Sequence, residues 1–252
     1  VALRMHGMVD LFHGEFINLS VLLRVAVGLA LIALSFADVL WRNRAGQSLR
    51  QVDYLARYDQ LTGVYNRGGF HARLSEMRLK GQIHPARTAV FYFDLDNFKS
   101  INDTHGHRTG DDILRHVGEV IRNALGENDI AGRLGGDEFV VIAQIDTLEH
   151  AIAHAEALQA QIARPVLSAG TTIISGASIG ILFGITAGGD IEEDIHRADL
   201  ALYQAKMDGR NTFRVFSSTL EDRVNRRIKV ETAVNRGLED GLFRLMYQLI
   251  IH

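Results

Sequence analysis

The chain has 252 residues, which is long for one domain and short for two, and 47% of them are hydrophobic, enough to build a core. Its formal net charge of −3 gives no indication of a nucleic-acid partner. The absence of cysteine excludes a disulfide framework and Cys-ligated metals, and agrees with a reducing compartment.

The first part, residues 1–50, contains the longest apolar run of the chain, residues 17–41. About twenty residues at a rise of about 1.5 Å each cross a bilayer core of roughly 30 Å, so this run predicts a transmembrane helix. Trp41 is placed as an interfacial aromatic residue, and three arginines between residues 42 and 50 put the following chain in the cytoplasm. A buried soluble helix or a dimerising stalk is the alternative. Because Val1 opens the chain, we expect further sequence upstream.

The second part, residues 51–216, alternates helical and extended patterns. Apolar spacing predicts a helical connector over residues 45–57. Asn66 is placed to cap a helix with one apolar face. Further helices are predicted over residues 110–125, 148–163 and 191–209, and a strand over residues 171–183. Helices interleaved with hairpin-joined strands indicate a mixed α/β layer rather than an all-parallel sheet.

An apolar, aromatic-rich run over residues 88–93 predicts a buried strand that ends in Asp94 and Asp96. Two residues apart on an extended chain, these carboxylates point to the same side. An acid at the end of a central strand suits a hard cation, and Asp94 is the stronger candidate. For Asp96 we favour a structural role, capping the turn that follows.

Gly135 and Gly136 separate two extended runs, and they are followed directly by Asp137 and Glu138. A Gly-Gly pair between extended runs predicts a β-hairpin, since glycine adopts the positive φ of a tight turn without a Cβ clash. Acids at a hairpin tip are ordinarily solvated turn residues. The second acidic cluster at Asp94 favours a shared Mg²⁺ site instead, because Mg²⁺ takes a few carboxylates, waters and substrate phosphates.

Between about residues 58 and 216 the chain resembles the GGDEF domain, the diguanylate cyclase family. Five separated motifs carry the resemblance, in the family's order. They are DQLTGVYNR (59–67), DLDNFKSIND (94–103), GHRTGD (106–111), GGDEF (135–139), and ADLALYQAK with GRN (198–206 and 209–211). The resemblance implies an α+β fold, with a central five-stranded mixed sheet flanked by helices, similar to nucleotidyl cyclase and polymerase palm domains.

The third part, residues 217–252, is a charged helical stretch followed by an alternating apolar strand over residues 242–250. It resembles the opening of an EAL phosphodiesterase domain, although Leu249 replaces the proline of that family's Tyr-Gln-Pro-Ile strand end. None of the catalytic positions of that family lies within the chain. An unpaired apolar strand is an edge liability, so we interpret this part as the truncated start of such a domain.

By resemblance, the chain condenses two GTP molecules into cyclic di-GMP and releases two pyrophosphates. The resemblance assigns the binding of Mg²⁺, or of Mn²⁺ in its place, to Asp94, Asp137 and the backbone carbonyl of Leu95. Asp137 or Glu138 would assist deprotonation of the attacking ribose 3′-hydroxyl, and the family pattern favours Asp137.

The same resemblance implies two groups of substrate-binding residues. The residues at the positions that contact substrate in the loop-to-helix segment are Asn102, His107 and Asp111, of which Asn102 and Asp111 match the guanine edge. The triphosphate would be bound by Lys206, Arg210 and the backbone amides of Asn97 and Phe98. On residue type alone, turn and cap chemistry explains the Asn and Asp positions, and a helix C-terminus attracts the two cations.

One position departs from the family pattern. Many members carry an Arg-x-x-Asp motif shortly before the signature, where the product binds and inhibits the enzyme. Here Asp129 is present, but Gly126 stands in place of the arginine. We therefore expect this primary product-inhibition site to be absent.

The implied working form is a homodimer that binds GTP, tethered to the bacterial inner membrane with its catalytic domain in the cytoplasm. It would be the signalling module of a GGDEF–EAL protein. The alternatives are a catalytically silent GTP-binding domain that regulates an attached cyclic di-GMP phosphodiesterase, and a dimerising signal relay.

Overall fold

The computed structural model describes residues 21, 23–36, 38, 41, 52–186 and 190–244, and the chain divides into two units, Val1–Tyr54 and Leu55–His252. In the first unit, residues 23–36 form a helix whose apolar side chains, among them Leu23 and Phe36, are exposed. No helix among the described residues has both the length and the apolar character needed to cross a bilayer. The predicted span, residues 17–41, lies partly outside the described residues, as does most of the connector over residues 45–57.

The second unit is built on a six-stranded mixed sheet in the order β1-β3-β4-β2-β7-β8. The strands are β1 (Tyr65–Asn66), β2 (Thr88–Leu95), β3 (Ile130–Arg133), β4 (Glu138–Gln144), β7 (Ala177–Phe183) and β8 (Phe213–Val215). The central strand β2 pairs antiparallel with β4 and β7, whereas the two edge pairings, β1 with β3 and β7 with β8, are parallel. The predicted hairpin around the Gly-Gly pair is confirmed as β3–β4.

Two expectations about the strands are wrong. The sheet has six strands rather than five, and its edge strands β1 and β8 are too short to give a sequence period. The single strand predicted over residues 171–183 is broken. β6 (Thr171–Ile173) pairs with β5 (Val166–Ser168) in a separate hairpin, and only β7 joins the main sheet. The break falls at residues 174–176, and the Gly176 carbonyl accepts a hydrogen bond from the Asp96 backbone N–H at 2.9 Å.

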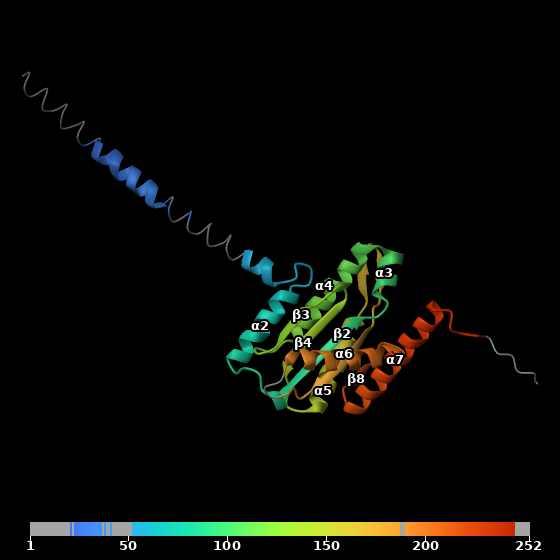
Figure 1. Ribbon diagram of the computed structural model, residues 1–252. Coiled ribbons are helices and arrows are strands. Elements are labelled where there is room, and N and C mark those ends of the chain that lie inside the picture. Colours follow the sequence, from blue (N-terminus) through green and yellow to red (C-terminus); the bar gives the residue numbers. More distant parts are fainter. Residues whose placement is uncertain are drawn as a thin grey trace, which may run out of the picture. The chain divides into compact units, whose positions relative to one another are not determined.

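Helices cover both faces of the sheet, as Figure 1 shows. They are α2 (Arg67–Leu79), α3 (Phe98–His105), α4 (His107–Ala124), α5 (Leu148–Ile162), α6 (Ile191–Met207) and α7 (Ser218–Glu239), with a 3₁₀ turn η1 (Pro85–Arg87). The predicted cap is confirmed, because the Asn66 side chain accepts a hydrogen bond from the Gly69 N–H at 2.8 Å.

The alternation of β2 divides the core into two layers. Phe91 and Phe93 pack with α4 and α5 on one face, whereas Val90 and Tyr92 pack with α2 and α6 on the other. Such two-sided burial explains why this strand reads as a continuous apolar run rather than an alternating one. It also fixes the direction of Asp94, which shares the α6 side of the strand with Tyr92.

Contact between β7 and α6 depends on Gly180. A Cβ at this position would lie 1.9 Å from the Ala198 carbonyl oxygen and 2.3 Å from the Leu202 nitrogen, so the helix backbone lies directly on the strand. We expect Gly180→Ala to lower the free energy of unfolding by about 3 kcal/mol, the upper end of the usual cost of overpacking. Denaturant titration measures this. The matched control is Gly68→Ala, where the new Cβ meets nothing closer than 3.6 Å; equal stability of the two variants would contradict the packing argument.

Helix α7 confirms the helix predicted after residue 217, and it packs against α6 with Val224 buried. Tyr203 Oη of α6 donates a hydrogen bond to Glu231 Oε2 of α7 at 2.9 Å, which fixes the two helices together. Residues 242–244 are not in a strand, and the remainder of the strand predicted over residues 242–250 lies outside the described residues.

Candidate functional site

The two acidic segments meet at the centre of the sheet. In the β2–β4 register Asp94 is directly opposite Glu138, and Asp137 immediately precedes β4. The antiparallel hairpin β3–β4 therefore delivers its turn to the end of the strand that carries Asp94. Leu95, whose backbone carbonyl is the third predicted metal ligand, is the last residue of β2.

Lys206, in the last turn of α6, is the cation nearest this cluster. Its Nζ lies 2.9 Å from Asp94 Oδ2, with 33% and 13% of the two side chains exposed. Burial is the largest influence on Asp94 and raises its pKa; the Lys206 hydrogen bond opposes that rise and the Asp137 carboxylate adds to it. Burial likewise raises the pKa of Asp137, with Lys206 opposing and Glu138 adding to the rise. The site thus concentrates negative charge that one ammonium group only partly offsets.

The donor atoms at this place fit a small hard cation. No group of three or more His, Cys, Asp or Glu side chains in the described part of the chain is arranged to hold a metal by itself. Asp94, Asp137 and the Leu95 carbonyl supply oxygen ligands only. Because Mg²⁺ prefers oxygen and completes its shell with water and substrate phosphates, an incomplete protein shell is what such a site needs.

The signature turn is held in place by Arg133. Its Nε and Nη2 donate to the Gly136 carbonyl oxygen at 3.0 and 2.6 Å, and its Nη1 donates to both carboxylate oxygens of Asp59 at 3.1 and 3.2 Å. Asp59 also accepts hydrogen bonds from the N–H and hydroxyl of Thr62. Burial alone would raise the pKa of Asp59, but the hydrogen bonds from Thr62 and the nearby Arg133 outweigh it and lower the pKa.

The loop that carries Asp59 is itself anchored to α4. Arg122 Nη1 donates to the Thr62 carbonyl oxygen. A Cβ on Gly118 would lie 2.4 Å from that same oxygen, so α4 passes close against the loop. No role was predicted for Asp59 or Arg133 from the sequence. The only sequence signal for them is their place in or beside the family motifs.

Glu138 has a different environment from Asp137. Tyr92, buried in β2, places its hydroxyl 3.5 Å from Glu138 Oε2, at the long limit of a hydrogen bond. Burial, and secondarily the Glu138 carboxylate, raises the pKa of Tyr92, so this phenol stays protonated and remains a donor.

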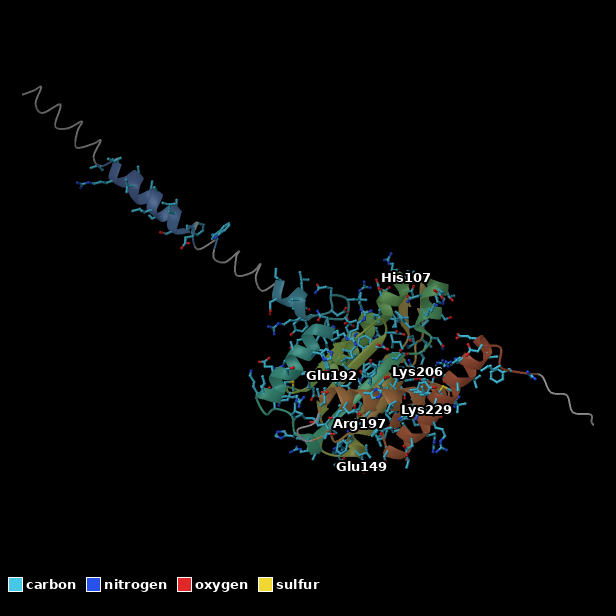
Figure 2. The ribbon with its side chains drawn as sticks, viewed as in Figure 1. His107, Glu149, Glu192, Arg197, Lys206 and Lys229 are labelled. Atoms are coloured by element: carbon cyan, nitrogen blue, oxygen red, sulfur yellow. The ribbon has the colours of Figure 1, made fainter. Side chains whose placement is uncertain are left out.

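The residues predicted to contact guanine lie on adjacent helices. Asn102 is on α3, while His107 begins α4 and Asp111 follows one turn later; Figure 2 labels His107. Asn102 Oδ1 is buried and has no hydrogen-bond partner among the described residues. It occupies the space beside Gly110, where a Cβ would approach it to 2.0 Å. An unpaired buried acceptor costs about 1–3 kcal/mol.

The residues predicted to contact phosphate come from two directions. Lys206 ends α6, and Arg210 follows on a left-handed turn with φ 65°. Asn97, with φ 59°, is the N-cap residue directly before α3. Arg210 and Asn97 both line a cleft of about 490 Å³, and Lys206 faces Asp94. Phe98 is the first residue of α3, so its backbone N–H is among the free amides of a helix N-terminus.

Asp96 does not cap the following turn, contrary to our expectation. The residue at the N-cap of α3 is Asn97, and its side chain makes no capping hydrogen bond. Asp96 is 7% exposed; its Oδ1 accepts from Ser178 Oγ at 2.7 Å and its Oδ2 from the Asn211 N–H at 2.8 Å. The carboxylate therefore joins β2 to β7 and to the turn after α6.

In the segment before the hairpin, residues 126–129, the Asp129 side chain accepts hydrogen bonds from the backbone. Asp129 Oδ2 accepts from the Gly126 N–H at 2.8 Å, and its Oδ1 accepts from the Gln144 N–H at 2.9 Å. Both carboxylate oxygens are thus used by the backbone, and position 126 offers no side chain.

Comparison with known proteins gives one matching family model, described as the diguanylate cyclase GGDEF domain, over residues 56–212. Among curated proteins, the chain is 37% identical over 213 residues to the cyclic di-GMP phosphodiesterase NbdA of Pseudomonas aeruginosa. That alignment covers 83% of this chain but 26% of NbdA, so the chain spans about a quarter of that relative's length.

Solved structures agree in fold. The coiled coil and GGDEF domain of DgcB from Caulobacter crescentus, in complex with c-di-GMP, matches with a TM-score of 0.62 and 30% identity, covering 75% of this chain and 98% of that one. The GGDEF domain of TpbB (YfiN) from Pseudomonas aeruginosa matches with a TM-score of 0.59 and 32% identity, covering 67% and 99%.

Proposed function

We propose that this chain, which belongs to the diguanylate cyclase GGDEF domain family, condenses two molecules of GTP into cyclic di-GMP and two pyrophosphates. The observation that carries the proposal is the sheet register, which sets Asp94 opposite the Asp137–Glu138 turn. The Lys206 ammonium, 2.9 Å from Asp94, adds a cation for phosphate at the same place. Carboxylates beside phosphate-binding cations are the equipment of a metal-assisted nucleotidyl transfer.

Positioning accounts for most of what these residues do. Mg²⁺, or Mn²⁺ in its place, bound by Asp94, Asp137 and the Leu95 carbonyl would stabilise charge on the attacking and leaving oxygens. Asp137, with Glu138 beside it, accepts the proton of the ribose 3′-hydroxyl. Because both carboxylates lie on a turn fixed by Arg133, they hold their geometry without help from substrate.

Guanine recognition follows from the hydrogen-bonding groups of α3 and α4. The edge of guanine presents the O6 acceptor beside the N1–H and N2–H₂ donors. The Asn102 amide N–H₂ would donate to O6, while the Asp111 carboxylate would accept from N1 and N2. Adenine has the opposite pattern at its six-position, so it would leave these groups unpaired. His107 lies at the exposed start of α4, within the same segment.

Phosphate binding involves both ends of the site. Lys206 acts as a point charge and Arg210 as a forked donor, which suits the geometry of phosphate oxygens. The N–H groups of Asn97 and Phe98, at the start of α3, add backbone donors. The triphosphate would thus lie between the end of α6 and the beginning of α3.

Incubation of the purified protein with GTP and Mg²⁺, with products identified by mass spectrometry, tests the proposal. We expect cyclic di-GMP and pyrophosphate, no cyclic product from ATP, and none after chelation of the divalent cation. GTP binding without any product would favour a second candidate: a silent GTP-binding domain that controls an attached cyclic di-GMP phosphodiesterase. The likeness to NbdA, a much longer protein named for phosphodiesterase activity, favours that candidate.

The remaining parts of the chain suggest how such a domain is deployed. We propose a tether to the bacterial inner membrane through residues 17–41, with residues 51–216 in the cytoplasm; the exposed apolar side chains of residues 23–36 support it. We also propose that residues 217–252 lead into an EAL-like domain in a longer GGDEF–EAL signalling protein. Support comes from the Tyr247–Ile250 sequence and from the short share of NbdA that the chain covers.

Feedback through the primary product site should be missing. Position 126 has no side chain to grip product, and both oxygens of Asp129 already accept backbone hydrogen bonds. Micromolar cyclic di-GMP is therefore expected to give no noncompetitive inhibition in steady-state assays. As a gain-of-function comparison, Gly126→Arg should introduce inhibition once Asp129 shifts from the 3.1 Å approach of the new Cβ. Noncompetitive inhibition of the unaltered chain, or product beside Asp129 in a crystal, would contradict this prediction.

A further inference from the structure

We propose that Asp96 is a positioning residue, which holds the turn after α6 in the conformation that lets Arg210 bind the triphosphate of GTP. This inference rests on the proposed function, because it presumes that a nucleoside triphosphate occupies the site. Asp96 itself is assigned no contact with substrate or metal. It acts through the backbone of Asn211.

The contacts of Asp96 are those of a built anchor. Its side chain is almost wholly buried, and each carboxylate oxygen accepts one hydrogen bond, from Ser178 Oγ at 2.7 Å and from the Asn211 N–H at 2.8 Å. The fit is tight, because a Cβ on Gly176 would lie 3.1 Å from Asp96 Oδ2 and 2.9 Å from Asn211 Oδ1. Glycine at position 176 therefore leaves the space in which the carboxylate reaches the turn.

The anchored turn is one that the backbone disfavours. Arg210 and Asn211 have φ values of 65° and 44°, so two consecutive residues with a Cβ are in the left-handed region. Gly209, with φ 116°, precedes them. Such conformations persist only where surrounding contacts over-determine them. The Arg210 N–H bonds to the Ala205 carbonyl at 3.2 Å, and the Asn211 N–H bonds to Asp96.

Asp96 also connects two halves of the site. It follows Asp94 by two residues, in the turn directly after β2, so its bond to Asn211 sets the position of the turn after α6 relative to the strand that carries Asp94. Asp96, Asn97 and Arg210 line the same cleft of about 490 Å³. If the turn opens, Arg210 is misplaced in most molecules, and the apparent Kd rises in inverse proportion to the competent fraction.

The test compares Asp96→Ala with Asp96→Asn in the full chain, by isothermal titration with GMP and with the unreactive α,β-methylene analogue of GTP. We expect Asp96→Ala to weaken the triphosphate by about tenfold or more, the effect of one lost charge-assisted hydrogen bond, and to change GMP affinity less than about twofold. Asp96→Asn should recover most of the affinity, because its carbonyl accepts from the Asn211 N–H while its amide donates to Ser178 Oγ.

Asp208→Asn is the matched control. Asp208 lies on the same turn, yet its carboxylate accepts hydrogen bonds from the side chains of Gln204 and Arg214 rather than from Arg210 or Asn211. The affinity of Asp208→Asn for the GTP analogue should match that of the unaltered chain. Losses from Asp96→Ala and Arg210→Ala should also be non-additive, since one acts through the other.

Several outcomes would overturn the inference. In the first, Asp96→Ala weakens the binding of the GTP analogue and of GMP equally. In the second, the losses of binding free energy from Asp96→Ala and Arg210→Ala add. In the third, Asp96→Ala leaves the affinity for the GTP analogue unchanged. If Asp96→Ala does not fold, hydrogen exchange is measured on the unaltered chain instead. We expect the Asn211 amide to be protected. Exchange as fast as in an open turn would refute the hydrogen bond between Asn211 and Asp96 as an anchor. An unaltered chain that binds no GTP analogue refutes the proposed function itself, a result distinct from all of these.

Discussion

Replacing Asp94 or Asp137 with asparagine is expected to lower the rate of cyclic di-GMP synthesis by about a thousandfold or more. Each change removes a negative charge from the shared cation site, and metal stabilisation of the reacting oxygens is worth several kcal/mol, where about 1.4 kcal/mol is tenfold in rate. The fold should survive. Because burial raises the pKa of Asp137, its charge opposes folding, and Asp137→Asn should unfold at an equal or slightly higher temperature.

Initial rates at saturating Mg²⁺, with thermal unfolding recorded on the same samples, measure both effects. Asp146→Asn is the matched control, because it makes the same chemical change at the opposite end of β4, where Asp146 pairs with Arg87. Turnover like that of the unaltered chain in either site variant would refute the assignment of Asp94 and Asp137. A variant that loses its folded state would instead show that these carboxylates are structural.

Activity is expected to require two chains. One pair of Asp94 and Asp137 would hold one GTP, whereas the proposed product joins two guanylates symmetrically. Two copies would therefore have to face each other about a twofold axis, each presenting its nucleotide to the ribose of the other, in an isologous arrangement. Specific activity of a fragment starting near residue 51 should rise with protein concentration, and a coiled-coil dimer fused to its N-terminus should restore activity at low concentration.

The assay compares specific activity from nanomolar to tens of micromolar, with light scattering on the same samples. As a control, a monomeric helix of equal length replaces the coiled coil and should restore nothing. Flat specific activity over the whole range, with only monomer detected, would show that one chain suffices and that the two-chain mechanism is wrong for this protein.

Local patterns predicted much of the fold. The β3–β4 hairpin was predicted from the Gly-Gly pair between two extended runs, although neither Gly135 nor Gly136 adopts the positive φ on which that prediction relied. The Asn66 cap follows from its place before an apolar helical face. The buried strand β2 could be predicted from its continuous apolar run, which it has because both of its faces are covered. In each case the information lies within about ten residues of the element it specifies. The convergence of Asp94 on the hairpin was predicted as well, because two acidic clusters suit a shared Mg²⁺ site.

Contacts between remote segments were not predictable in this way. The partners of Asp96 lie 82 and 115 residues away, so no local rule distinguishes its anchoring role from the cap that we expected. The Asp59–Arg133 pair spans 74 residues and escaped notice for the same reason. The break between β6 and β7 was missed because the β-branched residues on either side were weighed together, although Ser175, Gly176 and Ala177 interrupt them where the strands part.

The bond between Asp59 and Arg133 has a consequence for protein engineering. A fragment cut at the start of α2 would keep every residue predicted to act in catalysis or binding. It would nonetheless leave the Arg133 guanidinium without its carboxylate partner, and the Gly136 turn would be held by a loose side chain. A domain boundary drawn from the catalytic motifs alone would therefore lie too far along the chain and exclude the loop that carries Asp59. In a chimaera with a foreign sensor, the junction belongs upstream of Tyr58, so that the loop and the turn are transplanted as one piece.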